Sequence, residues 1–465
     1  MTTPFTVSFR ELDLLTTAVA QSLRTRGILP GERVGLLLPP GPAYPVLLLS
    51  LLRAGAIAVP ISTRLPKSLV PGLLGRIGCQ RLITDSSDQP NCASELSAID
   101  MAEIFLSSGD VNLLGEGVAQ AGVMVPPFDP TADATIVFTS GSTGAPKAAL
   151  HSFENHWSSA VGANRNIPLR PGDRWLLSLP PWHVGGLAVI FRCLLGGAAI
   201  AIAGKDEPLT DAIAGLGATH VSLVATQLYR LMSDELGRAA LRSLKAVLLG
   251  GGPAPAALLE EAAQAGVRLV TSYGSTEMSS QATATRPGDP PATLRTAGRP
   301  LAFRQVSVAA DGEILVRGRT LFRGYIEETR VRPARDHSGW FHTGDLGGFD
   351  SDGRLIVTGR RDTMFISGGE NIHPEEIERE ILRFPGVLET IVVPVPDSEF
   401  GARPAAFLRM VGGTLPADAE LDRFLRMTLP GFKVPRRYLP WPDVVEGMKP
   451  DRRALAALAA HAHPY

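Results

Sequence analysis

The sequence has few of the residues that mark secreted, membrane or nucleic-acid-binding proteins. Its 465 residues include three cysteines, which form neither a CxxC pair nor an even set for a disulfide framework, and this favours a reducing compartment. Lys and Arg number 45 against 46 Asp and Glu, so no overall positive field attracts nucleic acid or an anionic membrane. Anion binding must therefore depend on local groups.

Long uncharged apolar runs and an export signal are missing as well. The first residues, MTTPFTVSFRELD, lack the basic head and apolar run of a secretory signal, so we expect a cytoplasmic protein. Two apolar stretches, 43–61 and 185–203, contain Arg53 and Arg192. Because a central arginine costs roughly 2.5–3.5 kcal/mol on insertion scales, we interpret each stretch as a helix, a glycine and a buried strand, and expect no membrane span.

What the sequence does contain is typical of a soluble globular enzyme, with 45% hydrophobic and 20% charged residues. Its length predicts two or more domains. A helix, a glycine and a continuous apolar strand recur five times, which indicates parallel strands buried on both faces. The first ~290 residues are therefore predicted to be α/β. The glycines expected at the helix ends are Gly27, Gly55, Gly197, Gly217 and Gly266.

The pattern changes after this region. From Arg304 to Gly359 the chain shows short alternating runs, with hairpin turns predicted at Asp311-Gly312 and Asp352-Gly353. A compact α+β unit follows. We thus predict an N-terminal domain over 1–360, made of mainly parallel sheets with helices and a β-rich subdomain at about 300–359, a small mobile α+β domain over 361–465, and a hinge at 360–362.

The segment TSGSTGAPK, residues 139–147, is crowded with groups that bind anions. It lies between the strand-like ATIVFT and the helix-like ENHWSSAVGANR, so we expect a strand-to-helix turn that holds polyphosphate. Its spacing fits neither GxxxxGK[ST] nor GxSxG. A polar loop without a ligand is the alternative. The residues are the hydroxyl donors Thr139, Ser140, Ser142 and Thr143, the glycines Gly141 and Gly144, and the cation Lys147.

Four further motifs follow in a fixed order: SYGSTE (272–277), GWFHTGDLG (339–347), GRRD (359–362) and SGGENIHPEEIE (367–378). Together with TSGSTGAPK, this order resembles the adenylate-forming superfamily of acyl-CoA synthetases, adenylation domains and luciferases, over essentially the whole chain. The resemblance implies an acid–thiol ligase that uses ATP, Mg²⁺ and CoA and works through an acyl-adenylate.

The same resemblance implies roles for residues near the nucleotide. Thr276 would contact phosphate, and Glu277 would serve Mg²⁺, although alone it reads as a solvated loop carboxylate. Asp345 and Arg360 would bind the ribose, although Asp345 alone reads as a turn residue. GGGPAP, residues 250–255, would lie beside adenine through Gly251 and Gly252. Tyr273 would be the stacking ring, and Gly274 would also belong to the nucleotide site.

In the C-terminal part, superfamily members place a catalytic lysine in a Gly-Lys-x-x-Arg setting. Here EGMKPDRRAL offers Lys449, with one residue inserted after the glycine, and Lys433 in GFKVPRR is the competitor. Asp362 would be the hinge about which this domain turns between half-reactions. Gly368 and Gly369 would line the tunnel for the pantetheine thiol.

The acid is expected to contact LSLPPWHVGGLAVIFRCLLGG and THVSLVATQLYRLM. His183 is either a gate residue of the acid site or a helix-entry histidine. HVSLVATQ carries no acidic group for an α-amine, which disfavours an amino acid. A buried Arg192 needs an anion; a dicarboxylate would provide one, and pairing with an internal acid or reaching the surface are the alternatives. Ser222 and Thr226 are small hydroxyls suited to the pocket.

Within the superfamily, similarity to the ligases for 2-succinylbenzoate, an intermediate of menaquinone biosynthesis, is greatest in four segments: TSGSTGAPKAALH, WLLSLPPWHVGG, SLVATQLYRLM and SLKAVLLGGGPAP. Ligation of another aromatic or short-chain acid stays open, as do a carrier-loading adenylation protein and a regulatory nucleotide binder. The expected partners are the carboxylic acid, ATP and CoA, without nucleic acid. The oligomeric state is open, and a homodimer is compatible with the sequence.

Overall fold

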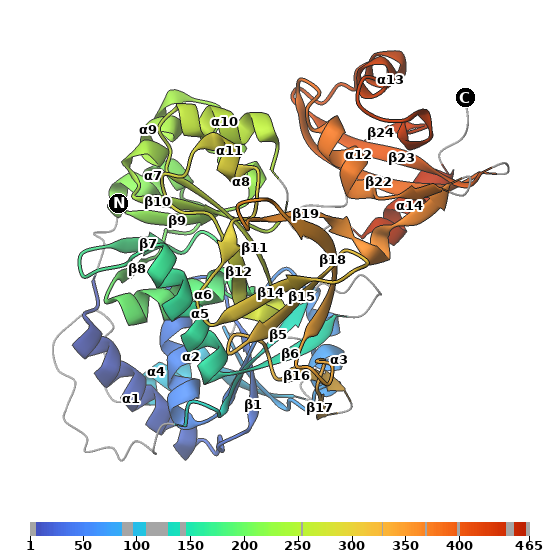
Figure 1. Cartoon of the computed structure of the whole chain (residues 1–465). Coiled ribbons are helices and arrows are strands. Elements are labelled where there is room, and N and C mark those ends of the chain that lie inside the picture. Colours follow the sequence, from blue (N-terminus) through green and yellow to red (C-terminus); the bar gives the residue numbers. More distant parts are fainter. Residues whose placement is uncertain are drawn as a thin grey trace.

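The computed structural model describes residues 6–85, 96–107, 129–139, 146–252, 254–327, 329–367, 370–397, 400–442 and 451–461. A large α/β body is followed by a smaller α+β unit, drawn in orange and red in Figure 1. Within the described residues, no helix has both the length and the apolar character needed to cross a membrane. The predicted fold class is confirmed.

The first sheet of the body runs in the order β17-β16-β6-β5-β2-β1-β3-β4. Strands β1 to β5 are parallel, whereas β6, β16 and β17 add antiparallel strands to one edge. The strands are β1 (Arg33–Leu37), β2 (Ile57–Pro60), β3 (Arg81–Thr84), β4 (Ser97–Asp100), β5 (Asp133–Thr139), β6 (Lys147–Ser152), β16 (Gly324–Glu327) and β17 (Arg330–Arg332).

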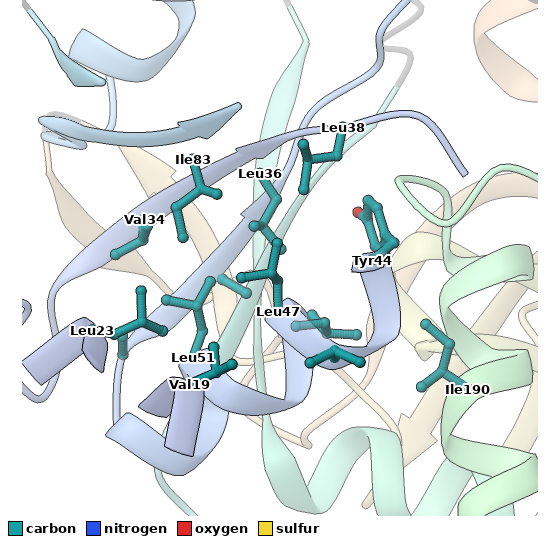
Figure 2. Packing of buried hydrophobic residues seen from close by; sticks show 14 of the residues in the cluster. Val19, Leu23, Val34, Leu36, Leu38, Tyr44, Leu47, Leu51, Ile83 and Ile190 are labelled. Atoms are coloured by element: carbon teal, nitrogen blue, oxygen red, sulfur yellow. The ribbon is translucent and has the colours of Figure 1, made fainter. Parts of the chain in front are cut away.

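Both faces of this sheet are buried, as the continuous apolar strands predict. On one face, Leu36 belongs to a cluster that includes Leu47 of α2 and Ile190 of α6, and Figure 2 shows Leu36 beside Leu47. On the other face, Leu37 packs in a cluster that includes Leu74 of α3. The helices of this part are α1 (Phe9–Thr25), α2 (Ala43–Ala54), α3 (Val70–Gly75), α4 (Met101–Ser107), α5 (Phe153–Asn166) and α6 (Val184–Gly196), with the 3₁₀ turn η1 (Lys67–Leu69).

The second sheet runs in the order β13-β12-β11-β10-β9-β7-β8, with its central strands parallel and β12 and β13 antiparallel. Its strands are β7 (Arg174–Leu176), β8 (Ala199–Ala201), β9 (His220–Leu223), β10 (Ala246–Leu249), β11 (Leu269–Ser275), β12 (Ser280–Ala284) and β13 (Arg299–Pro300). Its helices are α7 (Leu209–Gly215), α8 (Ala225–Met232), α9 (Glu235–Ser243), α10 (Ala256–Gln264), α11 (Pro291–Leu294) and the turn η3 (Thr276–Met278).

Helix α6 lies between the two sheets. Leu187 and Ile190 belong to the core beneath the first sheet, whereas Val189 and Cys193 pack with residues of the second. Contacts on both sides explain why this helix is apolar around most of its circumference.

The predicted helix–glycine–strand units are confirmed, because all five glycines adopt the left-handed conformation that ends a helix without steric cost. Their φ angles are 82° at Gly27, 80° at Gly55, 64° at Gly197, 58° at Gly217 and 83° at Gly266.

The predicted β-rich region forms an antiparallel sheet in the order β14-β15-β18-β19. Gly312 and Gly353 have φ angles of 84° and 72°, which confirms both predicted turns. The segment between β15 and β18 was not predicted to leave this sheet, yet it supplies β16 and β17 to the first sheet. The strands are β14 (Arg304–Val308), β15 (Glu313–Gly318), β18 (Phe341–Phe349) and β19 (Leu355–Arg360).

The C-terminal unit has its own hydrophobic clusters, on either side of a sheet in the order β22-β23-β24. Val392 faces the cluster that includes α12 and α13, and Val393 faces α14. The elements are η4 (Arg361–Thr363), β20 (Phe365–Ser367), β21 (Glu370–Ile372), α12 (Pro374–Ile381), β22 (Val387–Asp397), β23 (Gly401–Met410), α13 (Asp418–Leu425), η5 (Gly431–Lys433), β24 (Tyr438–Pro440) and α14 (Arg452–His461).

Candidate functional site

The phosphate-loop segment connects two strands and not a strand to a helix, so that prediction was wrong. Lys147–Ser152 forms β6 antiparallel to β5, and Thr139 pairs with Lys147 across the hairpin. Helix α5 begins only at Phe153, capped by Ser152. The short run KAALHS carries no local sign of its second partner, β16, which lies far along the chain. Five predicted loop residues, Ser140, Gly141, Ser142, Thr143 and Gly144, lie outside the described residues.

Lys147 lies next to the turn that carries Thr276 and Glu277, with Tyr325 between them. The Lys147 Nζ atom is 5.2 Å from the centroid of the Tyr325 ring. The Tyr325 hydroxyl donates to Glu277 Oε1 at 2.5 Å. Burial, followed by the Glu277 charge, raises the pKa of Tyr325, so this hydroxyl stays a donor. The structure therefore brings a predicted phosphate ligand and the predicted metal ligand into one cluster.

A buried histidine fixes the backbone of the same turn. His151 Nε2 lies 2.7 Å from the Thr276 carbonyl oxygen. Because a carbonyl only accepts, this nitrogen carries the proton. Burial lowers the pKa of His151, which keeps the ring neutral. The Thr276–Glu277 turn of the second sheet is thus held by a side chain of the first.

The predicted ribose ligands form a second cluster. Asp345 and Arg360 are cross-strand partners on β18 and β19, and Arg360 Nη1 donates to Asp345 Oδ1 at 3.0 Å. The Tyr273 hydroxyl donates to Asp345 Oδ2 at 2.6 Å. Arg360 also donates to both oxygens of Asp362, at 2.7 and 3.2 Å. The predicted hinge residue Asp362 is therefore tied to the predicted ribose ligands.

The two clusters adjoin. Burial, then Asp345 and finally Glu277 raise the pKa of Tyr273 well above its usual value, which places the Glu277 charge within range of this phenol. The Arg360 charge lowers the pKa of Tyr325, against the effects of burial and Glu277, so Arg360 also lies within range of this phenol. The residues predicted to bind phosphate, metal and ribose consequently face one region of the body.

The glycines of this region differ in what they require. Gly251 and Gly252 are exposed after β10, beside the end of β11, and Gly251 has a φ of 87°. At Gly274, an added Cβ would lie 2.1 Å from the Ser280 carbonyl oxygen of β12. Glycine at position 274 is thus required by strand packing, whatever ligand binds nearby.

The donor set around Glu277 suits magnesium. Mg²⁺ is usually held by one or two carboxylates, water and substrate phosphates, and not by an all-protein cage. No cluster of three or more His, Cys, Asp or Glu side chains arranged to hold a metal occurs in the described part of the chain. A single carboxylate near Lys147, the predicted phosphate ligand, fits a cation that arrives with a nucleotide.

The acid side is organised around Arg192 on α6. Its side chain is 1% exposed, so it does not reach the surface. Nη2 donates to Ser280 Oγ at 3.2 Å and to Gln281 Oε1 at 2.8 Å, whereas Nε and Nη1 lack a hydrogen-bond partner among the described residues. Burial lowers the pKa of Arg192 to about 10. Of the two structural alternatives, neither surface exposure nor pairing with an acid is found in the described part.

Trp175 connects Arg192 to another predicted acid-site residue. The guanidinium carbon lies 5.3 Å from the centroid of a Trp175 ring. The indole Nε1 donates to Ser222 Oγ at 3.1 Å. Arg192 and Ser222, which are 30 positions apart, thus share one aromatic neighbour. Thr226 lies in the first turn of α8, just beyond the strand that carries Ser222.

His183 occupies the N-cap position of α6, with φ −107° and ψ 148°, and its side chain makes no cap hydrogen bond. It is exposed and lies beside the buried Trp182, with 6.5 Å between ring centroids. The helix-entry position that was one of its two interpretations is therefore observed.

In the C-terminal unit, the two competing lysines differ. Lys433 Nζ lies 2.6 Å from Glu376 Oε2 and 2.7 Å from Glu376 Oε1, so this lysine is already paired. Arg452, three positions after Lys449, donates to Glu378 at 2.7 and 3.0 Å. This ion pair anchors the end of the segment that carries Lys449. Lys449, Gly368 and Gly369 themselves lie outside the described residues.

Sequence reasoning missed Tyr325, His151 and Trp175. A glycine before the short run YIE was a weak strand signal for Tyr325. Nothing local pointed to the other two, because their partners are distant in the sequence.

Comparison with known proteins matches nearly the whole chain. A family model described as "AMP-binding enzyme" matches residues 2–326, and one described as "AMP-binding enzyme C-terminal domain" matches residues 376–445. The 2-succinylbenzoate–CoA ligase of Salmonella typhimurium is 35% identical over 453 residues, covering 97% of this chain and 92% of that protein. The enzyme of that name from Bacillus cereus is 32% identical over 442 residues, covering 93% and 89%.

Solved structures agree with these matches. An Escherichia coli MenE variant with bound OSB-AMS has a TM-score of 0.81 and 33% identity, covering 97% of this chain and 92% of that chain. The o-succinylbenzoate CoA synthetase of Bacillus subtilis in complex with the acyl-adenylate OSB-AMP has a TM-score of 0.85 and 29% identity, covering 97% and 93%. The Bacillus subtilis enzyme with ATP and magnesium ion has a TM-score of 0.84 and 29% identity, covering 97% and 94%.

Proposed function

Because the chain belongs to the AMP-binding enzyme family, we propose that it is an acid–CoA ligase that forms 2-succinylbenzoyl-CoA from 2-succinylbenzoate, ATP and CoA. The full-length similarity to ligases of that name supports the reaction. The buried Arg192, two of whose guanidinium nitrogens have no hydrogen-bond partner in the described part of the chain, is the observation that carries the identity of the acid. The reaction is a step of menaquinone biosynthesis and takes place in the cytoplasm.

In the first half-reaction, a carboxylate oxygen of the acid attacks the α-phosphorus of ATP. The bond between this phosphorus and the oxygen that bridges to the β-phosphate breaks, and pyrophosphate leaves. Positioning and charge stabilisation carry most of such catalysis. Thr139, Lys147 and the loop between them grip the β- and γ-phosphates. Thr276 contacts phosphate, while Asp345 and Arg360 hold the ribose. Glu277 holds Mg²⁺, which neutralises phosphate charge when bound.

In the second half-reaction, the CoA sulfur attacks the acyl carbon, the thiol proton is released, and AMP leaves. One site serves both steps if the C-terminal domain, residues 361–465, turns about Asp362 relative to residues 1–360. This rotation takes Lys449 out of the active site and brings in the Gly368–Gly369 loop. A Cβ at either glycine would obstruct the path of the thiol. The separate hydrophobic clusters of the C-terminal unit support this division.

Lys449 and not Lys433 is the lysine of adenylation. A catalytic cation must be available to the reacting carboxylate and α-phosphate, whereas Lys433 already pairs with both oxygens of Glu376. The Arg452–Glu378 pair supports the same choice, since it anchors the arginine of the Gly-x-Lys-x-x-Arg pattern in the core of the unit.

For the acid, Arg192 receives the carboxylate that does not react. Buried charges need partners, and a dicarboxylate supplies an anion that Arg192 does not have among the described residues. Trp175 and Ser222 surround the aromatic ring of the substrate, Thr226 borders it, and His183 gates the entrance at the start of α6.

The test is a panel of acids in ATP–pyrophosphate exchange, followed by mass spectrometry of the product formed with CoA. We expect exchange with 2-succinylbenzoate and a CoA thioester of its mass. Benzoate, which lacks the second carboxylate, should exchange poorly. Exchange with a monocarboxylate but not with 2-succinylbenzoate would reject the acid and favour a ligase for another aromatic or short-chain acid. Adenylate formation without a CoA thioester would favour a carrier-loading protein. A homodimer is compatible with either outcome, and light scattering measures it.

A further inference from the structure

Tyr325 contacts two groups that the proposed reaction uses, although it belongs to none of the motifs found in the sequence. Its hydroxyl donates to Glu277 Oε1 at 2.5 Å, and its ring faces Lys147 Nζ at 5.2 Å from the centroid. It reaches this position because β16 pairs with β6, which places Tyr325 opposite Ala149, two residues after Lys147. The side chain therefore lies where the phosphate loop and the metal carboxylate meet.

The backbone of the Glu277 turn is already fixed by other groups. The Phe322 amide donates to the Glu277 carbonyl oxygen at 2.8 Å, and His151 donates to the Thr276 carbonyl oxygen at 2.7 Å. These bonds hold the main chain but leave the Glu277 side chain able to rotate. Among the described residues, the Tyr325 hydroxyl supplies the side-chain hydrogen bond that fixes the direction of this carboxylate.

We propose, on the basis of the proposed function, that Tyr325 is a positioning residue that orients Glu277 toward the magnesium of MgATP. With Oε1 engaged by the hydroxyl, Oε2 is left for the cation. A carboxylate that a hydroxyl already holds by a hydrogen bond loses less rotational freedom when it binds a ligand. The ring face attracts the Lys147 ammonium group and so keeps it beside the same site.

The decisive variant is Tyr325→Phe, because it removes the hydroxyl and keeps the ring. The ring packs edge-on against Phe322 at 4.8 Å between centroids, so removing it entirely would also disturb the core. The chain offers a matched control in Tyr438→Phe. The Tyr438 hydroxyl donates to Asp422 Oδ1 at 2.8 Å inside the C-terminal unit, so this change also breaks a tyrosine–carboxylate bond, away from the nucleotide residues.

Two measurements separate positioning from general damage. The first is the magnesium concentration that gives half-maximal ATP–pyrophosphate exchange with 2-succinylbenzoate. The second is calorimetric binding of a non-hydrolysable ATP analogue to the full chain, with and without Mg²⁺ and without any acid. For Tyr325→Phe we expect the half-maximal magnesium concentration to rise about 10-fold, the size of effect that a lost bond to a charged group predicts. The gain in analogue affinity on adding Mg²⁺ should shrink, and the KM for the acid should stay unchanged.

Wild-type magnesium dependence in Tyr325→Phe would overturn the proposal, as would an equal change in Tyr438→Phe. The calorimetry keeps this test separate from the identity of the acid. If wild-type protein binds the analogue with Mg²⁺ but exchanges pyrophosphate with no acid in the panel, the proposed substrate fails while the role of Tyr325 is still decided by the calorimetric difference.

Discussion

The nucleotide side and the acid side of the candidate site handle charge in opposite ways. On the nucleotide side, Asp345 is paired with Arg360 and Tyr273, and Glu277 accepts from Tyr325. On the acid side, Arg192 is fully buried, and two of its three guanidinium nitrogens lack a partner among the described residues. Within the described residues, the carboxylates of one side are paired, and the other side has a buried charge without an acidic partner.

This difference follows from what each side must recognise. ATP is common to the whole family, so its ligands can be held in place by one another before it binds. The acid distinguishes one ligase from another, and a buried group left unpaired penalises every acid that cannot satisfy it. Under the proposed function, general chemistry belongs to the nucleotide side and substrate choice to the acid side.

The largest expected effect concerns the proposed catalytic lysine. Lys449→Ala should reduce acyl-adenylate formation by roughly 10²-fold or more, because it removes a group that stabilises developing charge between the acid and the α-phosphate. Conversion of supplied acyl-adenylate with CoA should be retained. Single-turnover assays of the two half-reactions measure this split.

Lys433→Ala is the matched control, because Lys433 is already paired with Glu376. This substitution should leave adenylation almost unchanged. If Lys433→Ala abolished adenylation and Lys449→Ala did not, the alignment of the catalytic lysine would be wrong. An equal loss of rate in both half-reactions of Lys449→Ala would reject the proposal that Lys449 serves the first half-reaction and the Gly368–Gly369 loop the second.

The next prediction concerns the unpaired charge. Arg192→Met should raise the KM for 2-succinylbenzoate about 10-fold or more, since a charge-assisted hydrogen bond contributes roughly 1.5–3 kcal/mol. The KM for ATP should not change. The unfolding midpoint of the free enzyme should fall little or even rise, because replacing a buried ion by an apolar side chain of similar size is often neutral or stabilising.

Arg192→Lys is the corresponding control, since it keeps the charge and loses the planar fork, and its acid KM should be intermediate. A sharp fall in the unfolding midpoint of Arg192→Met with an unchanged acid KM would show that Arg192 is a satisfied core residue. The contrast between the two sides would then disappear.

Local sequence patterns predicted most of the fold. Helix–glycine–strand units and Asp-Gly turns depend on neighbours in the chain, and the structure contains all of those that were expected. The error at β6 has a physical cause. The second partner of β6 is β16, in which Gly324 pairs with Leu150. Pairing between residues so far apart in the sequence produces no hydrophobic periodicity in either segment, so a local pattern cannot reveal it.

The same limit explains which site residues could be predicted. Asp345 and Arg360 lie in ordered motifs, and their cross-strand pairing follows from a hairpin that the sequence also predicts. Tyr325 has no motif, and its role depends on the unpredicted pairing of β16 with β6. The sequence could not show either that two nitrogens of Arg192 lack partners among the described residues. That state depends on which residues of β12 lie beside the guanidinium group, and no described carboxylate is among its partners.

The smallest predicted effect tests how completely the nucleotide side is held in place. His342 Nδ1 lies 2.9 Å from Glu313 Oε2, and Glu313 Oε1 accepts from the Gly344 amide at 2.9 Å, next to Asp345. The hydrogen bond to Glu313, together with the charges of Glu313 and Asp336, raises the pKa of His342. A raised folded-state pKa contributes stability that is fully present below the unfolded value of about 6.5 and is lost as pH rises through the folded value.

His342→Gln should therefore lower the unfolding midpoint at about pH 6 but not at about pH 9, where the wild-type ring is already neutral. The side chain is 54% exposed, so solvent screening keeps the difference near 1 °C or less. Differential scanning calorimetry at the two pH values measures it. An equal difference at both values would mean that the imidazolium charge adds nothing, and that the ring contributes equally in its neutral form.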